Sequence, residues 1–182
     1  MPSESIRHTQ PAANDPSIDP VLTLILRYTK PVALIGIAFA LSHLARLLRQ
    51  RGENAQAVPL FSQSARISQE IGDDARLAEA LEGLGGVMVE LGAGPDAARL
   101  LGLARSIRQQ SASPRLSVHQ PGYEQDMATI EAAVGADRLT ALITEGAAMA
   151  QEDLLARLGG AESGPSTRWD TRAAPDDSQP QR

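Results

Sequence analysis

The feature that most limits the fold of this chain is an internal repeat with a period of 40 residues. When the sequence is shifted by 40 positions, large apolar residues fall on large apolar residues and small residues on small ones. The matched pairs are Leu41 with Leu81, Leu44 with Leu84, Ala45 with Gly85, Leu48 with Met88, Gly52 with Gly92, Ala57 with Ala97, Leu60 with Leu100, Phe61 with Leu101, Ser64 with Ala104 and Ile67 with Ile107. A period of about 20 to 50 residues with helical spacing is typical of stacked helical hairpins. The sequence therefore predicts an all-α fold, a short solenoid of helix pairs.

The small residues of this pattern predict where the helices of a pair approach each other. Ala57 and Ala97 occupy the same place in the second helix of each unit, so we expect the two backbones to cross there. Gly52 and Gly92 are predicted to form the tight turn between the paired helices. The glycines at 83, 85 and 86 lack the spacing of a phosphate-binding loop after a strand, which favours a packing role over ligand binding.

This spacing resembles the tetratricopeptide repeat, with two units at about residues 38–72 and 78–110. A longer resemblance covers about residues 33–158, carried by the segments EGLGGVMVELGAGPDAARLLGLARSIR (82–108) and YEQDMATIEAAVGADRLTALITEGAAMAQEDLLARL (123–158). These segments are similar to the C-terminal helical region of bacterial signal-transducing ATPase regulators with LuxR-type, SARP-type or cyclase output domains. The resemblance implies a region built for packing and gives no catalytic residue.

Proline, glycine and polar residues predict the borders of the helical part. We expect a disordered N-terminal segment (1–18), a helical repeat region (19–110), a loop (111–121), a C-terminal helical cap (122–159) and a disordered tail (160–182). Within the repeat region, Pro31 is expected to separate a short helix at 20–29 from a longer one at 31–51. Three helices are expected in the cap, at 122–134, 136–147 and 150–158.

Composition excludes several classes of function. The chain has 17 basic and 22 acidic residues, a net charge of −5, which argues against direct binding of nucleic acid. It has no cysteine, and its three histidines are far apart in sequence, so neither a thiol nucleophile nor a zinc site is expected. The phosphate-binding pattern GxxxxGK[ST] is absent. We therefore expect no enzyme activity, no cofactor and no metal.

The longest apolar run, residues 31–41, is shorter than the roughly 20 residues that span a bilayer. A buried helix is the preferred interpretation, which leads us to expect a cytoplasmic protein without a membrane segment.

Charged residues on the first helix of each unit are the best candidates for a binding site. In a tetratricopeptide-type stack these helices line a concave groove, so a groove basic at one end and acidic at the other is predicted. The residues expected to line it are Phe39, Ser42, Arg46, Arg49, Glu79, Glu82 and Glu90. Such a groove could hold an extended or helical segment of a partner. The alternative is that these charges pair with one another or with water.

The leading hypothesis is a non-catalytic protein–protein interaction module with a regulatory role, binding a protein or peptide partner. The alternatives are a transcriptional regulator that acts directly on DNA and a truncated, non-functional fragment of a larger ATPase regulator. Two repeats are few for a continuous core. The helix at 20–29 and the helices after 121 therefore have to cover the open ends of the stack, or a second subunit has to do so.

Overall fold

A computed structural model of the protein describes residues 20–150 and residue 153. The predicted end segments, 1–18 and 160–182, and almost all of a third cap helix predicted at 150–158 lie outside the described residues. The chain divides into a first unit, residues 1–33, and a second unit, residues 34–182. The first unit contributes the N-terminal part of helix α1, and everything discussed below belongs to the second unit unless stated.

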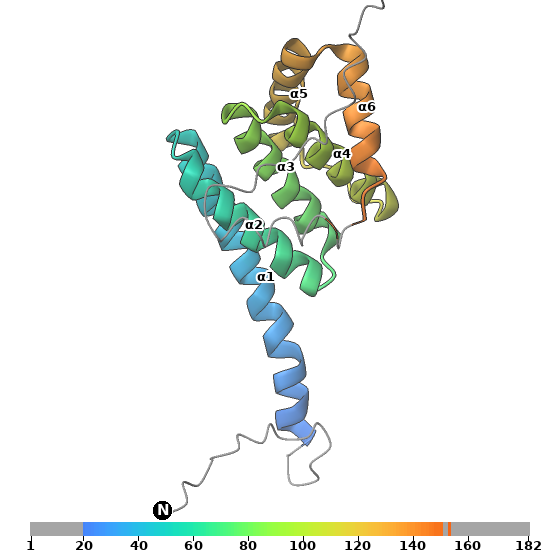
Figure 1. Ribbon diagram of the computed structural model, residues 1–182. Coiled ribbons are helices and arrows are strands. Elements are labelled where there is room, and N and C mark those ends of the chain that lie inside the picture. Colours follow the sequence, from blue (N-terminus) through green and yellow to red (C-terminus); the bar gives the residue numbers. More distant parts are fainter. Residues whose placement is uncertain (1–19, 151–152, 154–182) are drawn as a thin grey trace, which may run out of the picture. The chain divides into compact units, whose positions relative to one another are not determined.

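The described residues form six α-helices (Figure 1). They are α1 (Pro20–Gln50), α2 (Asn54–Glu70), α3 (Asp74–Glu90), α4 (Gly94–Gln110), α5 (Gln120–Val134) and α6 (Ala136–Ala147), with a 3-10 turn at Ser117–His119 before α5. No strand occurs among these residues. The predicted all-α fold built of helical hairpins is confirmed.

Two prolines lie inside helices, and one of them corrects the expected borders. The helices predicted at 20–29 and 31–51 are a single helix, α1, which continues through Pro31. Proline removes one backbone hydrogen bond and crowds the carbonyl four residues earlier, but a long helix can bend and continue past it. Pro59 is accommodated in the same way inside α2.

Turns between the first four helices recur every 20 residues. Gly52, Gly72 and Gly92 each end a helix in the left-handed region, with φ of +76°, +70° and +77°. After each glycine, the next backbone N–H donates to the carbonyl five residues earlier, as in Glu53 to Leu48 at 2.9 Å. This pairing, together with the glycine N–H bonded three residues back, is the Schellman motif. Because the next helix begins within two residues, each turn reverses the chain into a tight hairpin.

The same position after α4 is occupied by Ala112, which lies at φ 51°. An L-residue with a Cβ pays about 1–2 kcal/mol in this region, whereas glycine does not. We expect Ala112→Gly to raise the free energy of unfolding by about 1 kcal/mol, and Gly92→Ala to lower it by a similar amount. Urea denaturation of the two variants checks this; a destabilised Ala112→Gly variant would contradict it.

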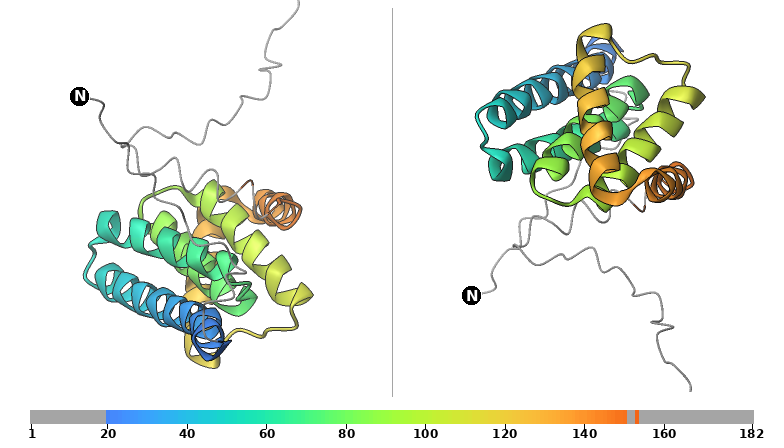
Figure 2. Two further views of the ribbon diagram at one scale, coloured as in Figure 1. Left: turned by 90° about the horizontal axis from the view of Figure 1, so that it is seen from below. Right: turned by 90° about the horizontal axis from the view of Figure 1, so that it is seen from above.

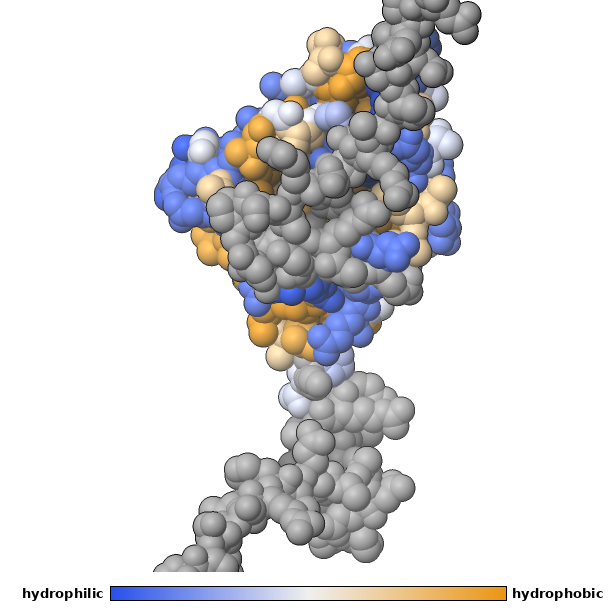
Figure 3. Space-filling model, viewed as in Figure 1, coloured by the Kyte–Doolittle hydropathy of each residue, from blue (hydrophilic) through white to orange (hydrophobic). Residues whose placement is uncertain are grey.

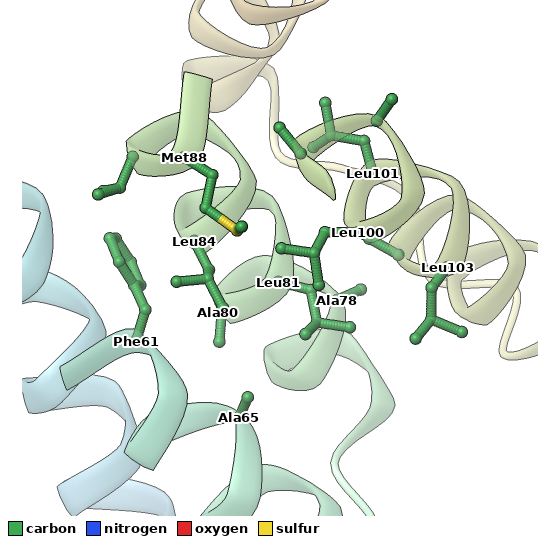
Figure 4. Packing of buried hydrophobic residues seen from close by; sticks show 14 of the residues in the cluster. Phe61, Ala65, Ala78, Ala80, Leu81, Leu84, Met88, Leu100, Leu101 and Leu103 are labelled. Carbon is green, nitrogen blue, oxygen red and sulfur yellow. The ribbon is translucent and has the colours of Figure 1, made fainter. Parts of the chain in front are cut away.

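Small residues lie where the paired helices cross, as predicted. Ala57 and Ala97 are both fully buried. A Cβ built on Gly85 would lie 3.0 Å from the side chain of Leu101 and 3.5 Å from the carbonyl oxygen of Ala97, so α3 and α4 are in close contact there. Gly83 faces the ring of Phe61, which packs from α2 onto α3 (Figure 4). Gly83 and Gly85 therefore pack against neighbouring side chains, as expected, and Gly83 also lines the cavity described below.

The C-terminal helices do not repeat the hairpin arrangement. Here α6 packs extensively on α4, in the manner in which α3 packs on α2, while α5 makes smaller contacts with α3 and α4. Figure 2 shows α5 running across the stacked hairpins. The predicted loop 111–121 is also shorter than expected, because it holds the 3-10 turn and α5 begins at Gln120, ahead of Pro121. The cap therefore closes the α4 end with α6 and leaves α5 free to lie over α3.

Helix α1 is less buried than the sequence suggested. Its segment Pro31–Gln50 is long and apolar enough to cross a membrane by length and composition, and 17% of it is buried in the structure. A buried helix was expected here, but one face alone is covered: Ala38, Ser42 and Ala45 pack toward α2. Large apolar side chains on the other faces remain exposed.

Candidate functional site

A cavity of about 530 Å³ opens between α1, α3, the 3-10 turn and α5. We call it the α1–α3–α5 cavity. The charged residues and the histidine that line it come from all of these elements: Arg46, Arg49, Glu82, Glu90, His119 and Asp126. Arg46, Arg49, Glu82 and Glu90 belong to the set of residues that the sequence predicted to line a groove. The cavity is therefore the part of the structure that corresponds to the predicted groove.

Arg49 ties α1 to two other helices. Its guanidinium donates to both carboxylate oxygens of Asp126 on α5, at 2.6 and 3.2 Å, and to Glu90 on α3 at 2.7 Å. Burial by itself lowers the pKa of Arg49, but the hydrogen bonds to the two carboxylates raise it above its usual value, so the guanidinium stays charged. Asp126 is buried, with 7% of its surface exposed. A buried carboxylate needs such a partner, and Arg49 therefore holds α5 in place.

Arg46 lies one turn earlier on α1 and makes a second link. It donates to Glu79 on α3 in a short ion pair and to Nδ1 of His119 at 3.3 Å. Burial and the positive charge of Arg46 lower the pKa of His119, so its imidazole is neutral at pH 7 and accepts this bond. The link joins the 3-10 turn to the repeat region.

Glu82 is the centre of the third and most buried link. It accepts two bonds from Arg108 on α4, at 2.8 and 3.0 Å, and one from Arg115 at 2.7 Å. Burial alone raises the pKa of Glu82, but these two arginines lower it below its usual value. Arg115 also stacks its guanidinium 3.4 Å from the ring centre of Tyr123, the third residue after Gln120 on α5.

Three of the seven residues predicted to line a groove, Phe39, Ser42 and Glu79, do not line the cavity. Ser42 is buried between α1 and α2, where its hydroxyl lies 2.8 Å from that of Ser64, and it offers a partner no surface. Phe39 is exposed, with the ring of His43 tilted against it and the guanidinium of Arg76 over its face at 4.9 Å. Glu79 contributes as the partner of Arg46.

The predicted separation into a basic and an acidic end is wrong. The arginines of α1 pair with the acids of α3 and α5, because the stacked first helices bring these opposite charges within hydrogen-bond distance. Arg108, on the second helix of its hairpin, pairs with Glu82 of α3. The cavity is therefore lined by paired charges of both signs.

Sequence reasoning missed Asp126, His119, Arg108 and Arg115. For Asp126 a signal was present: it lies on the face of α5 that carries Tyr123, Met127 and Ile130, a helical stripe that is otherwise apolar. A carboxylate in such a stripe indicates a buried ion pair, although it does not indicate which cation is the partner. Nothing in the local sequence of Arg115 indicates its pairing with Glu82.

The lining of the cavity offers both donors and acceptors of hydrogen bonds. Within the described part of the chain, no group of three or more histidine, aspartate or glutamate side chains could hold a metal ion. The charged groups are held by one another at fixed positions, which suits the binding of a polar segment.

Comparison with known proteins supports the assignment of a helical repeat region. Residues 36–110 match the tetratricopeptide repeat family. HTH-type transcriptional regulators of Mycobacterium tuberculosis strain H37Rv and of Mycobacterium bovis are each 28% identical to the chain over 133 residues, 71% of this chain and 15% of theirs. The chain thus spans 15% of the length of these curated relatives. No solved structure matches it. The hairpin packing and the family match together make residues 36–110 a tetratricopeptide-like repeat region.

Proposed function

We propose that this chain is a non-catalytic protein-interaction module of a regulatory protein, and that its α1–α3–α5 cavity binds a short segment of a partner. The module comprises the repeat region, 19–110, and the C-terminal cap, 122–159. The observation that carries the proposal is the cavity of about 530 Å³, lined by charged groups at fixed positions in a tetratricopeptide-like fold. Such repeats typically mediate contacts between proteins.

The partner is a polar segment that carries both hydrogen-bond acceptors and donors. Side chains of Arg46, Arg49 and Glu90 are 24%, 23% and 39% exposed, so each can make a further bond without leaving its internal partner. Because the lining charges are paired, attraction by net charge contributes little, and recognition depends on the placement of individual groups.

A role in transcriptional regulation is supported by the relatives, which are named as HTH-type transcriptional regulators. We propose that the chain serves such a regulator through protein contacts, in the cytoplasm, and that it does not contact DNA itself. Its acidic balance, −5, supports this over direct DNA binding.

The test compares two charge-adding variants that leave all ion pairs intact. Val118 lines the cavity and is 75% exposed; Leu116, two residues earlier, is 61% exposed and lies outside the lining. We expect Val118→Glu to reduce capture of the partner in a pull-down from native lysate by about tenfold or more. Leu116→Glu, with the same added charge, should leave capture unchanged.

Equal losses in the two variants would show a general effect of charge, and no loss in either would exclude the cavity as the binding site. Reversing Arg46 and Arg49 is a poorer test. Those changes would break the pairs with Glu79 and Asp126 and release α5, so a loss of binding would not separate a site from a damaged fold.

A further inference from the structure

The exposed face of α1 is equivalent to a buried face of α3. In the 40-residue register, Ile37, Leu44 and Leu47 correspond to Leu77, Leu84 and Val87. The residues of α3 are 2%, 1% and 0% exposed because α2, α4 and α5 pack on α3, whereas those of α1 are 47%, 48% and 54% exposed. Ala40, which is exposed, likewise corresponds to the buried Ala80. We call Ile37, Ala40, Leu44 and Leu47 the α1 stripe; Figure 3 shows apolar surface in the part of the molecule that α1 occupies.

None of the other described helices covers this stripe. The second helices of the two hairpins are already engaged, since α2 packs on α3 and α4 packs on both α3 and α6. A contiguous apolar face of this kind is unusual on an isolated soluble domain and marks an interaction surface.

The partner of the stripe differs from the second helix of a preceding repeat. On α3, Gly83 leaves the space into which α2 inserts the ring of Phe61. The equivalent residue on α1 is His43, whose own ring lies against Phe39 with a centroid distance of 3.9 Å. A bulky residue presented in the way that Phe61 is presented to α3 would meet the imidazole ring.

The stripe is instead suited to pairing with itself. Its spacing of 3, 4 and 3 residues places large side chains on either side of the small Ala40. When two such helices cross antiparallel at Ala40, Leu44 of one lies near Ile37 of the other, and the two alanines allow the backbones to approach as they do at Ala57 and Ala97. Residues 31–45 contain no charged side chain, so two identical faces do not repel each other.

We propose that the α1 stripe is a homodimer interface, with a second copy of this chain as its occupant and with the two α1 helices crossing at Ala40. Such a contact is isologous, so every residue of the stripe is used twice. The dimer places a second α1 helix against the face of α1 that the described helices leave exposed.

Sedimentation of the full chain over a range of concentrations is the first test, and the expected result is a mass twice that of the monomer at micromolar concentrations. Leu44→Arg should weaken the dimer at least about 100-fold, since a central apolar contact is lost on both sides of the symmetry axis. Leu91→Arg is the matched control, because Leu91, the C-cap residue that follows α3, is 54% exposed and lies off the stripe. It should leave the dimer unchanged, and circular dichroism should show equal helicity in both variants.

A crosslinking variant tests where the two helices cross. The chain has no cysteine, so Ala40→Cys introduces a single thiol, and mild oxidation should link two chains covalently. Leu91→Cys should not form this link.

A chain that is monomeric at all concentrations would overturn the proposal, as would a dimer that Leu44→Arg leaves intact. Flotation with phosphatidylcholine–phosphatidylglycerol vesicles provides the remaining arm. If the wild-type protein is monomeric and floats with the vesicles, and the Leu44→Arg variant does not float, the stripe binds a lipid surface in place of a second copy.

Discussion

Replacing Gly146 by alanine should destabilise the protein by about 2 kcal/mol, although alanine is the better helix former. Gly146 lies on α6 where it crosses α4, and a Cβ there would collide with the backbone of Arg99. The three atoms that it would meet are the carbonyl oxygen, the carbonyl carbon and the Cα, so no side-chain rotation relieves the contact. Helix α6 has to move away from α4, which opens one of the largest helix contacts of the fold. Thermal denaturation should show a fall in Tm of about 4–8 °C.

The same substitution at Gly122 is the control for this prediction. Gly122 is also helical, on α5, and a Cβ built on it meets no atom within 4 Å. There the helix preference of alanine acts alone, and stability should rise by up to about 1 kcal/mol. Opposite signs at the two glycines would establish the close crossing. A Gly146→Ala variant that is as stable as the wild type would show that α6 does not pack backbone to backbone on α4.

Helices α2, α3 and α4 and the C-terminal part of α1 were predictable because the repeat period and the turn residues agree on them, whereas the break expected at Pro31 does not occur. The 40-residue period sets the pairing, and glycines every 20 residues set the turns, with Gly52, Gly72 and Gly92 all in the left-handed region. The arrangement after α4 was not predictable from this rhythm. A fifth helix in step would begin near residue 114, but Pro114 falls in the extended connection that precedes the 3-10 turn. Because the connection after α4 is longer than the earlier turns, α5 lies across α3, and α6 packs on α4 instead.

The candidate site was predictable in its residue types and less so in its pairing. Arg46 and Arg49 were found because the repeat register places them on the inner side of the first helices. Their partners are 33 to 77 residues away in sequence, which is the separation of Glu79 from Arg46 and of Asp126 from Arg49. Such distant pairs depend on how the helices stack, and the amino-acid composition does not specify the stacking. The spacing of i and i+3 or i+4 reveals pairs only within one helix, such as Asp96 with Arg99.

Glu82→Gln should destabilise the protein at pH 7 by about 3 kcal/mol or more. The carboxylate is the common partner of Arg108 and Arg115, and all three side chains are largely buried, with exposures of 9%, 11% and 14%. Glutamine keeps the shape and one acceptor, but it leaves two buried guanidinium groups without a counter-charge. Urea denaturation at pH 7 measures the loss. Glu145→Gln is the control, because Glu145 pairs with Arg99 on the surface and is 47% exposed, so its loss should cost less than about 1 kcal/mol.

The pH dependence separates the ion pair from a loss of packing. Burial raises the pKa of Glu82, but the bonds from Arg108 and Arg115 bring it below the ordinary value of 4.5 that the unfolded chain has. A group whose pKa is lowered on folding stabilises the protein above its unfolded pKa, and this stabilisation is lost as the pH falls through the folded pKa. The wild type should therefore lose more stability than Glu82→Gln as the pH falls below 4.5, and the difference between them should shrink. A difference that stays constant from pH 7 to pH 3 would mean that the substitution acts through shape, and that the charge of Glu82 does not hold α3, α4 and the 3-10 connection together.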